Sequence, residues 1–276
     1  MQVNTFLGTE VLISAGTFFS QQQGKKISIS LTRDFYMMTH LMSQSLYLKI
    51  MGKEWEHCKY KSPDLPVDRI CWLDSVVLAN TFSDMAGLEK VYTIPSEVEA
   101  LNKLREGGRT THDGADQISK QVTMNIDANG YRLPLSAEWE YAAKGGEDYI
   151  FAGSDDIEEV AWYGGYEFQA STDNWIDDGS GNSGNITHPV GLKKPNGYGL
   201  YDMCGNVYEW CWDGVKEYAQ DILIDPMGDP NSPERIRRGG CWSSYKHYCE
   251  ISKIRSDVPS LRRYFGIRFC RSKSVE

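Results

Sequence analysis

The stretch that decides the fold reads YGLYDMCGNVYEW and covers residues 198–210. Gly199 and Gly205 permit tight turns and close approach of neighbouring backbone. Glu209 stands among aromatic residues, so its carboxylate needs a partner such as a backbone N–H, the guanidinium of Arg268 or a cation. The stretch therefore predicts an ordered, buried turn and not a flexible linker.

Three further segments surround this stretch along the chain. They are PVD (66–68) with CWLD (71–74), YRLPLSAEWEYAA (131–143), and RGG (238–240) with GIRF (266–269). Glycines 239 and 240 again allow close backbone approach. Trp139, Trp210 and Trp242 are large enough to fill a core that contains little regular structure. We expect all three indoles to be buried.

The hydropathy pattern predicts a modest number of regular elements. The expected strands are Thr9–Ser20, Ile27–Met38, Arg235–Trp242 and Phe265–Arg271. The expected helices are Ser43–Met51, Cys71–Gly87 and Ser136–Lys144. In the last helix we expect Ser136 to cap the N-terminus and Gly145 to end it. The intervening chain from Asp177 to Gly199 is rich in Gly and Asn but keeps Trp and Tyr, which is typical of ordered loops.

Taken together, the four segments resemble the formylglycine-generating enzyme, or sulfatase-modifying factor, domain, a variant of the C-type lectin fold. The resemblance covers about residues 8–273. It implies an α+β protein, loop-rich, with few short strands and two or three helices. We expect one domain over residues 1–276, with a variable ligand-binding region at about 235–271 and a polar surface insertion at about 96–122.

The charge of the chain is unevenly distributed. The 276 residues carry a formal net charge of −9. From Arg235 to Glu276 there are 11 Lys+Arg and 3 Asp+Glu, so this part alone carries +8. Its arginines alternate with aromatic and aliphatic residues, which favours pairing with acidic residues of the body over binding of nucleic acid. No apolar run approaches the roughly 20 residues of a membrane-spanning helix, and no signal peptide is visible.

The seven cysteines predict neither a zinc site nor a disulfide framework. None stands in a CxxC pair, and no histidine follows at zinc-finger spacing. We expect mostly reduced, buried thiols. Cys241 and Cys270 are the best candidates for a disulfide, provided that their two strands are neighbours.

The resemblance also implies a metal site. Asp202, Gly205, Val207 and Glu209 match the positions that hold calcium in enzymes of the family, two of them through carbonyl oxygens. Oxygen ligands of this kind suit calcium. A hydrogen-bonded loop without a metal remains the alternative, so a structural calcium is possible and no cofactor is required. One departure from the family is Leu135, at a position usually held by Thr or Ser.

The oxidase chemistry of the family needs two cysteines five residues apart, just after the RGG strand, to hold copper and to form a mixed disulfide with the substrate. Here Cys249 stands at the second position and Ser244 at the first. A serine hydroxyl cannot replace a soft thiolate ligand. We therefore expect no copper and no catalytic residues, with a degenerate or active oxidase acting on protein cysteine as the alternative.

Two other activities lack their key groups. The five histidines show no ligand spacing for the iron site of related sulfoxide synthases. The nearest stretch to a calcium-dependent sugar-binding loop is Lys194-Pro195-Asn196, which lacks the carboxylate. An iron enzyme and a sugar lectin are therefore both disfavoured.

The segment from Ser243 to Phe265 stands between two well-matched framework strands but has no periodicity of its own. It resembles the C-terminal variable region of diversity-generating retroelement proteins, such as treponemal variable proteins, which display this region for ligand binding. Rigid aromatic area combined with adaptable hydroxyls is typical of paratopes. The expected exposed contacts are Ser243, Ser244, Tyr245, His247, Tyr248, Ser252, Ile254, Ser256, Asp257, Ser260, Leu261, Tyr264 and Phe265. Some, such as Ile254 or Leu261, could instead plug the core, and we expect substitutions such as Ser244→Tyr to be tolerated.

This reading predicts a non-catalytic ligand-binding protein at the cell surface or outside the cell. The expected partner is a protein on a host or bacterial surface, of neutral or acidic character. We expect no nucleic-acid partner and no membrane insertion by this chain. Another type of non-catalytic binding domain remains open.

Overall fold

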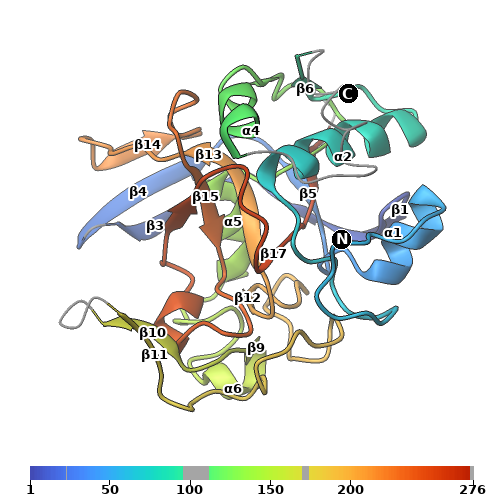
Figure 1. The fold of residues 1–276 in the computed structure, drawn as a ribbon. Coiled ribbons are helices and arrows are strands. Elements are labelled where there is room, and N and C mark those ends of the chain that lie inside the picture. Colours follow the sequence, from blue (N-terminus) through green and yellow to red (C-terminus); the bar gives the residue numbers. More distant parts are fainter. Residues whose placement is uncertain (23, 96–111, 170–173, 274–276) are drawn as a thin grey trace.

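The structure is a computed structural model that describes residues 1–22, 24–95, 112–169 and 174–273. The protein is an α+β fold in which short elements are joined by long ordered loops (Figure 1). The helices are α1 (Gln44–Met51), α2 (Trp72–Met85), α4 (His112–Ser119), α5 (Ser136–Lys144), α6 (Ile157–Val160) and the 3-10 turn η1 (Lys246–Cys249).

Three sheets of three or more strands organise the described part of the chain. The five-stranded sheet has the order β1 (Gln2–Thr5), β2 (Gly8–Ile13), β5 (Phe35–Met38), β18 (Cys270–Ser272), β8 (Tyr131–Arg132). The four-stranded sheet has the order β16 (Arg255–Asp257), β15 (Arg235–Arg238), β13 (Tyr208–Gly214), β17 (Phe265–Gly266). The three-stranded sheet has the order β14 (Ile222–Ile224), β4 (Lys25–Leu31), β3 (Gly16–Gln22).

Smaller pairs of strands complete the fold. They are β6 (Tyr92–Thr93) with β7 (Thr123–Met124), β9 (Ala161–Trp162) with β12 (Cys204–Gly205), and β10 (Tyr166–Gln169) with β11 (Asn174–Asp177). In Figure 1 the β10–β11 hairpin lies at the opposite end of the molecule from α2 and α4. The strands are more numerous than the sequence suggests because most contain only two to four residues, too few to show an alternating pattern.

Each of the two long strands expected near the N-terminus is in fact two strands. The strand conformation is interrupted at residues 14–15 and again at 32–34. As a result, β2 and β5 join one sheet, while β3 and β4 join another. The backbone N–H of Ala15 donates to the Asp34 carboxylate (2.9 Å), which ties the two crossover points together. The strand expected over 265–271 is likewise divided, into β17 and β18. An alternating pattern cannot distinguish one long strand from two that continue into different sheets.

The three expected helices are confirmed, with one correction to a cap. Ser43 caps α1, and Cys71 with Asp74 caps α2. Ser136 is inside α5, and Leu135 occupies its N-cap position without a polar side chain. Two carboxylates compensate: Glu138 accepts from Leu135 N (2.8 Å), and Asp213 accepts from Ser136 N (2.6 Å). The residue that replaces the usual Thr or Ser therefore relies on an acid from β13.

The basic C-terminal part of the chain is bound into the acidic body, as expected. The buried pairs are Arg238–Glu140, Arg268–Glu209 and Arg271–Glu10, and Arg262 pairs with buried Asp74. Trp139 and Trp210 are fully buried and Trp242 nearly so, which confirms the expected core. In Figure 1 helix α5 lies behind the central strands β13 and β15. The C-terminal strands are thus joined to the body by buried ion pairs as well as by apolar packing.

The insertion expected at 96–122 is only partly described, because residues 96–111 lie outside the described part of the chain. In the rest, α4 occupies His112–Ser119, Ile118 and Val122 pack into the main core, and Gln117, Lys120 and Gln121 are exposed. The described end of the segment therefore combines exposed polar residues with apolar contacts to the core. Among the described residues, no helix is both long enough and apolar enough to cross a membrane.

Candidate functional site

A cavity of about 570 Å³ opens beside the four-stranded sheet. Its walls come from the start of β13, from β15, β16 and β17, and from the two loops at 241–244 and 261–264. Lys59, Tyr166 and Asn185 reach it from segments far away in the sequence. The volume and mixed lining are typical of a ligand site. We refer to it below as the sheet-edge cavity.

Aromatic rings form most of the apolar lining of the sheet-edge cavity. They belong to Tyr166, Tyr208, Trp242, Tyr248, Tyr264 and Phe265. The Trp242 and Tyr264 rings meet edge to face with centroids 5.0 Å apart. The position of Trp242 is fixed, because its backbone N–H donates to Asn206 O (2.8 Å) and its side chain packs with Leu41 and Val207. The aromatic wall is therefore rigid, as a binding surface requires.

Ser244 lies in this wall and is tightly bonded. Its hydroxyl contacts Cys241 N (3.1 Å) and Cys241 Sγ (3.2 Å) and donates to the Tyr208 hydroxyl (3.0 Å). Gly164 N donates to Ser244 O (2.9 Å). With 6% of its surface exposed, Ser244 is not the freely variable position that we expected. Local sequence gives no sign of this burial, which depends on β13 and on residues near 164.

Two thiols lie close to the positions at which the family resemblance implies a cysteine pair. Cys241 lines the sheet-edge cavity, whereas Cys249 is fully buried and is not part of the lining. Burial raises the pKa of the Cys249 thiol well above its usual value, which disfavours the thiolate needed for a metal bond. At the two positions where the resemblance implies thiolates, Ser244 therefore provides a hydroxyl in the cavity wall and Cys249 a buried thiol.

The disulfide considered between Cys241 and Cys270 is not present. All seven cysteines are buried and free. Cys270 begins β18, whose neighbours are β5 and β8, while Cys241 follows β15 in a different sheet. The Cys270 thiol instead contacts the Arg132 guanidinium (2.9 Å). The condition that the two strands be neighbours fails.

The thirteen expected contact residues do not share one exposed face. Those that line the sheet-edge cavity are Ser243, Ser244, Tyr248, Ser256, Asp257, Leu261, Tyr264 and Phe265. Of these, Ser243, Ser244, Tyr248 and Phe265 are buried, so exposure was the wrong expectation for them. Tyr245, His247 and Ser260 line neither this cavity nor the second one described next. The structure thus brings eight of the thirteen residues together around one space.

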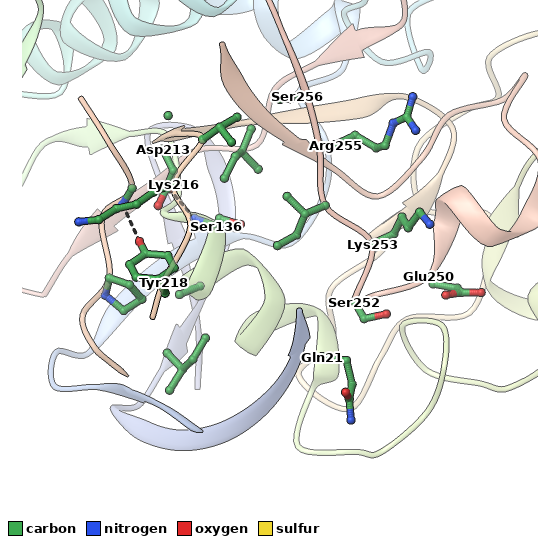
Figure 2. A pocket seen from close by; sticks show the side chains of 18 of the residues that line it. Gln21, Ser136, Asp213, Lys216, Tyr218, Glu250, Ser252, Lys253, Arg255 and Ser256 are labelled. Carbon is green, nitrogen blue, oxygen red and sulfur yellow. Dashed lines mark hydrogen bonds between the residues drawn. The ribbon is translucent and has the colours of Figure 1, made fainter. Parts of the chain in front are cut away.

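A second cavity of about 520 Å³ lies on the other side of the segment 252–256 (Figure 2). Ser252 and Ile254 line this cavity, and Arg255 and Ser256 contribute to both. Figure 2 shows Lys216 and Tyr218 on the opposite wall from Lys253 and Arg255. One short stretch of chain therefore serves as a partition between two cavities. The sequence alone cannot show that neighbouring residues line different cavities.

Asp213 lies in the wall of the second cavity, with 3% of its surface exposed. Burial raises the pKa of its carboxyl to about 7, although the hydrogen bond from Ser136 N opposes this shift. The native state thus holds this proton more tightly than the unfolded chain does. The contribution of Asp213 to the free energy of unfolding therefore falls as the pH rises from about 4 to about 7.

We expect Asp213→Asn to remove this pH dependence. At about pH 3, below the pKa of Asp213 in both the native state and the unfolded chain, the variant and the wild type should have similar free energies of unfolding, because both side chains are then neutral in both states. At pH 8 the variant should be more stable than the wild type by more than about 1 kcal/mol, given about 1.4 kcal/mol per pKa unit. Urea unfolding at both pH values measures the difference, and a stability difference that does not change with pH would contradict the assignment.

Of the four residues expected to bind calcium, Glu209 has both carboxylate oxygens engaged by other groups, whereas Asp202 Oδ1 is buried without a hydrogen-bond partner among the described residues. Both oxygens of Glu209 accept from Arg268 (3.0–3.2 Å), and one also accepts from Trp139 Nε1 (3.0 Å). Asp202 accepts from Gly191 N (2.7 Å), and burial raises the pKa of its carboxyl to about 6. Within the described residues, no group of three His, Cys, Asp or Glu side chains could hold a metal. The guanidinium of Arg268 already provides the positive charge that Glu209 needs.

Comparison with known proteins places this geometry in a family. The model of the Sulfatase-modifying factor enzyme 1-like domain matches residues 2–273. The chain belongs to this family, and its fold is the C-type lectin-like fold expected from the sequence.

Individual relatives are a chaperone, a variable protein and an enzyme. The chain is 34% identical to the chaperone protein LppX of Paenibacillus barcinonensis, over 95% of this chain and 89% of the relative. Its structure is similar to Treponema denticola variable protein 1, with a TM-score of 0.78, 27% identity, and coverage of 96% and 95% of the two chains. It is 36% identical to the formylglycine-generating enzyme of Streptomyces coelicolor, but over only 53% of this chain and 47% of that enzyme.

Proposed function

We propose that this protein is a non-catalytic binding protein that holds part of a protein ligand in the sheet-edge cavity. The observation that carries the proposal is the lining itself: eight of the thirteen expected contact residues meet there, with rigid aromatic rings and adjacent hydroxyls. Interfaces of this composition gain most of their affinity from a few aromatic anchors. The similarity to a chaperone and to a variable protein along nearly the whole chain supports a protein as the ligand.

We further propose that the residues around this cavity vary through a diversity-generating retroelement. The framework strands β15 and β17 flank the segment and are fixed by buried contacts, so changes at the partly exposed positions between them, such as Ser252 and Ser256, would leave the fold intact. The genomic test is to look for a neighbouring reverse transcriptase gene and for an asparagine-codon-rich near-copy of the region that encodes residues 238–269. Display at the cell surface, toward a host or bacterial surface protein, is part of the same proposal.

The test of the binding site uses Tyr264→Ala. Truncating a central aromatic anchor should weaken binding of a ligand found by surface display by about 1–2 kcal/mol or more, because the rigid contact area is lost. The matched control is Phe19→Ala, which removes an exposed ring on β3 outside both cavities. Isothermal titration of both variants provides the comparison. Equal affinities for Tyr264→Ala and wild type would place the site elsewhere.

An oxidase is the alternative function, and we expect it to be absent. A peptide that contains Cys-X-Pro-X-Arg should remain unmodified after incubation with the protein and copper. Ser244→Cys should not create the activity, because Cys249 is fully buried and its pKa is raised well above the usual value, which disfavours a second thiolate. Mass spectrometry of the peptide measures aldehyde formation, and aldehyde produced over several turnovers would contradict the proposal.

A further inference from the structure

The sheet-edge cavity is rich in unpaired positive charge. Lys59, Arg255 and Arg263 line it, and none of them forms an ion pair with a carboxylate of the described residues. The one carboxylate in the lining, Asp257, is already paired with Arg237 (2.6 Å). Four other basic residues of the C-terminal part, Arg238, Arg262, Arg268 and Arg271, are bound to buried acids. The three cations at the cavity therefore differ from the structural ones.

Aromatic faces stand next to these cations. The Lys59 ammonium lies 4.5 Å from the centre of the Trp242 ring, and the Arg255 guanidinium lies 4.9 Å from the centre of the Tyr248 ring. Such contacts hold a cation in place without neutralising it. In addition, the buried Nε1 of Trp242 has no hydrogen-bond acceptor among the described residues. A buried donor without a partner is costly, and an acceptor brought by a ligand would relieve that cost.

We propose that the sheet-edge cavity binds an acidic side chain, Asp or Glu, of the protein ligand against Lys59, Arg255 and Arg263. The inference rests on the proposed binding function and adds the chemistry of the group recognised. An acidic protein segment fits better than a nucleic acid, because the cations are confined to one cavity of a chain with a net charge of −9. An extended polyanion would face repulsion from the rest of the surface.

The experiment begins with a random-peptide display library selected on the wild-type protein. The selected peptides are expected to be enriched in Asp and Glu relative to the starting library. A synthetic copy of a selected peptide should lose affinity by about 10-fold or more when its acidic residue is changed to the corresponding amide. The double variant Lys59→Glu/Arg263→Glu should bind the acidic peptide at least as weakly as the wild-type protein binds the amide form of the peptide.

The control is Lys25→Glu/Lys216→Glu, which changes the net charge equally but lies outside the sheet-edge cavity. This control should bind the acidic peptide within about 2-fold of the wild-type affinity. Added salt screens the long-range electrostatic effect of the changed net charge. Peptides that need Tyr264 but show no acidic enrichment would overturn the charge inference and leave the binding function standing. Failure to select any peptide that depends on Tyr264 would overturn both.

Discussion

Replacing Arg268 by Met is expected to lower the free energy of unfolding by about 3–5 kcal/mol. Arg268 is fully buried and donates to both oxygens of Glu209, to Met38 O (3.0 Å) and to Tyr201 O (2.6 Å). It thereby joins the end of the chain to β5, to β13 and to the loop before β12. Without it, Glu209 is a buried carboxylate that keeps a side-chain hydrogen bond from the Trp139 indole.

The control for Arg268→Met is Lys194→Met, which removes a solvent-exposed ion pair with Glu159. That variant should lose less than about 1 kcal/mol, since exposed pairs contribute little. Arg268→Lys should also be strongly destabilised, because an ammonium cannot donate to Glu209 and two carbonyls in the fork geometry of Arg. Urea denaturation at pH 7 measures all three variants. A loss for Arg268→Met no larger than that for Lys194→Met would show that the pair does not hold the fold together.

Replacing Trp242 by Ala is the second change with a large expected effect, about 3–5 kcal/mol. The indole is 4% exposed, packs with Leu41 and Val207, and forms one wall of the sheet-edge cavity. Its removal would enlarge an existing cavity and leave the rings of Tyr60 and Tyr264 without their neighbour. Thermal melts of the variant and wild type measure the loss.

Ser244→Tyr provides a second, independent measure of how rigid this wall is. Because Ser244 is buried and bonded to Cys241 and Tyr208, the larger side chain should cost about 1–3 kcal/mol through overpacking. The matched control in the same segment is Ser252→Tyr, at a partly exposed position, which should change stability by about 0.5 kcal/mol or less. Equal losses for Ser244→Tyr and Ser252→Tyr would contradict the division of the segment into buried wall and tolerant positions.

Much of the fold can be predicted from short stretches because their chemistry allows few alternatives. The run of residues 198–210 needs a buried turn, and Glu209 among aromatic residues needs a cationic partner, which is Arg268. Helices α1, α2 and α5 follow from apolar spacing with a cap or a terminal glycine. Ser244 stands where the family resemblance implies a cysteine. This difference also bears on function, because it can be read from the sequence alone.

The candidate site could be predicted only as a segment and not as a surface. Sequence identifies residues 243–265 as irregular and rich in Tyr and Ser, and eight of the thirteen residues singled out do line one cavity. It cannot show that Ser252 and Ile254 face a second cavity, or that Ser244 is enclosed by Tyr208. Lys59 and Tyr166 were missed altogether, because nothing local connects them to the C-terminal segment.

The sequence by itself determined the family and the buried aromatic core, because these depend on residue identity within short windows. Only the tertiary structure decided how the segment is divided between two cavities, which strands are neighbours, and which cations remain unpaired. Those properties arise from contacts between residues far apart in the chain, such as Lys59 with Trp242 and Arg268 with Met38. Irregular loops carry no periodicity, so the direction of each side chain is fixed by the partners it meets after folding.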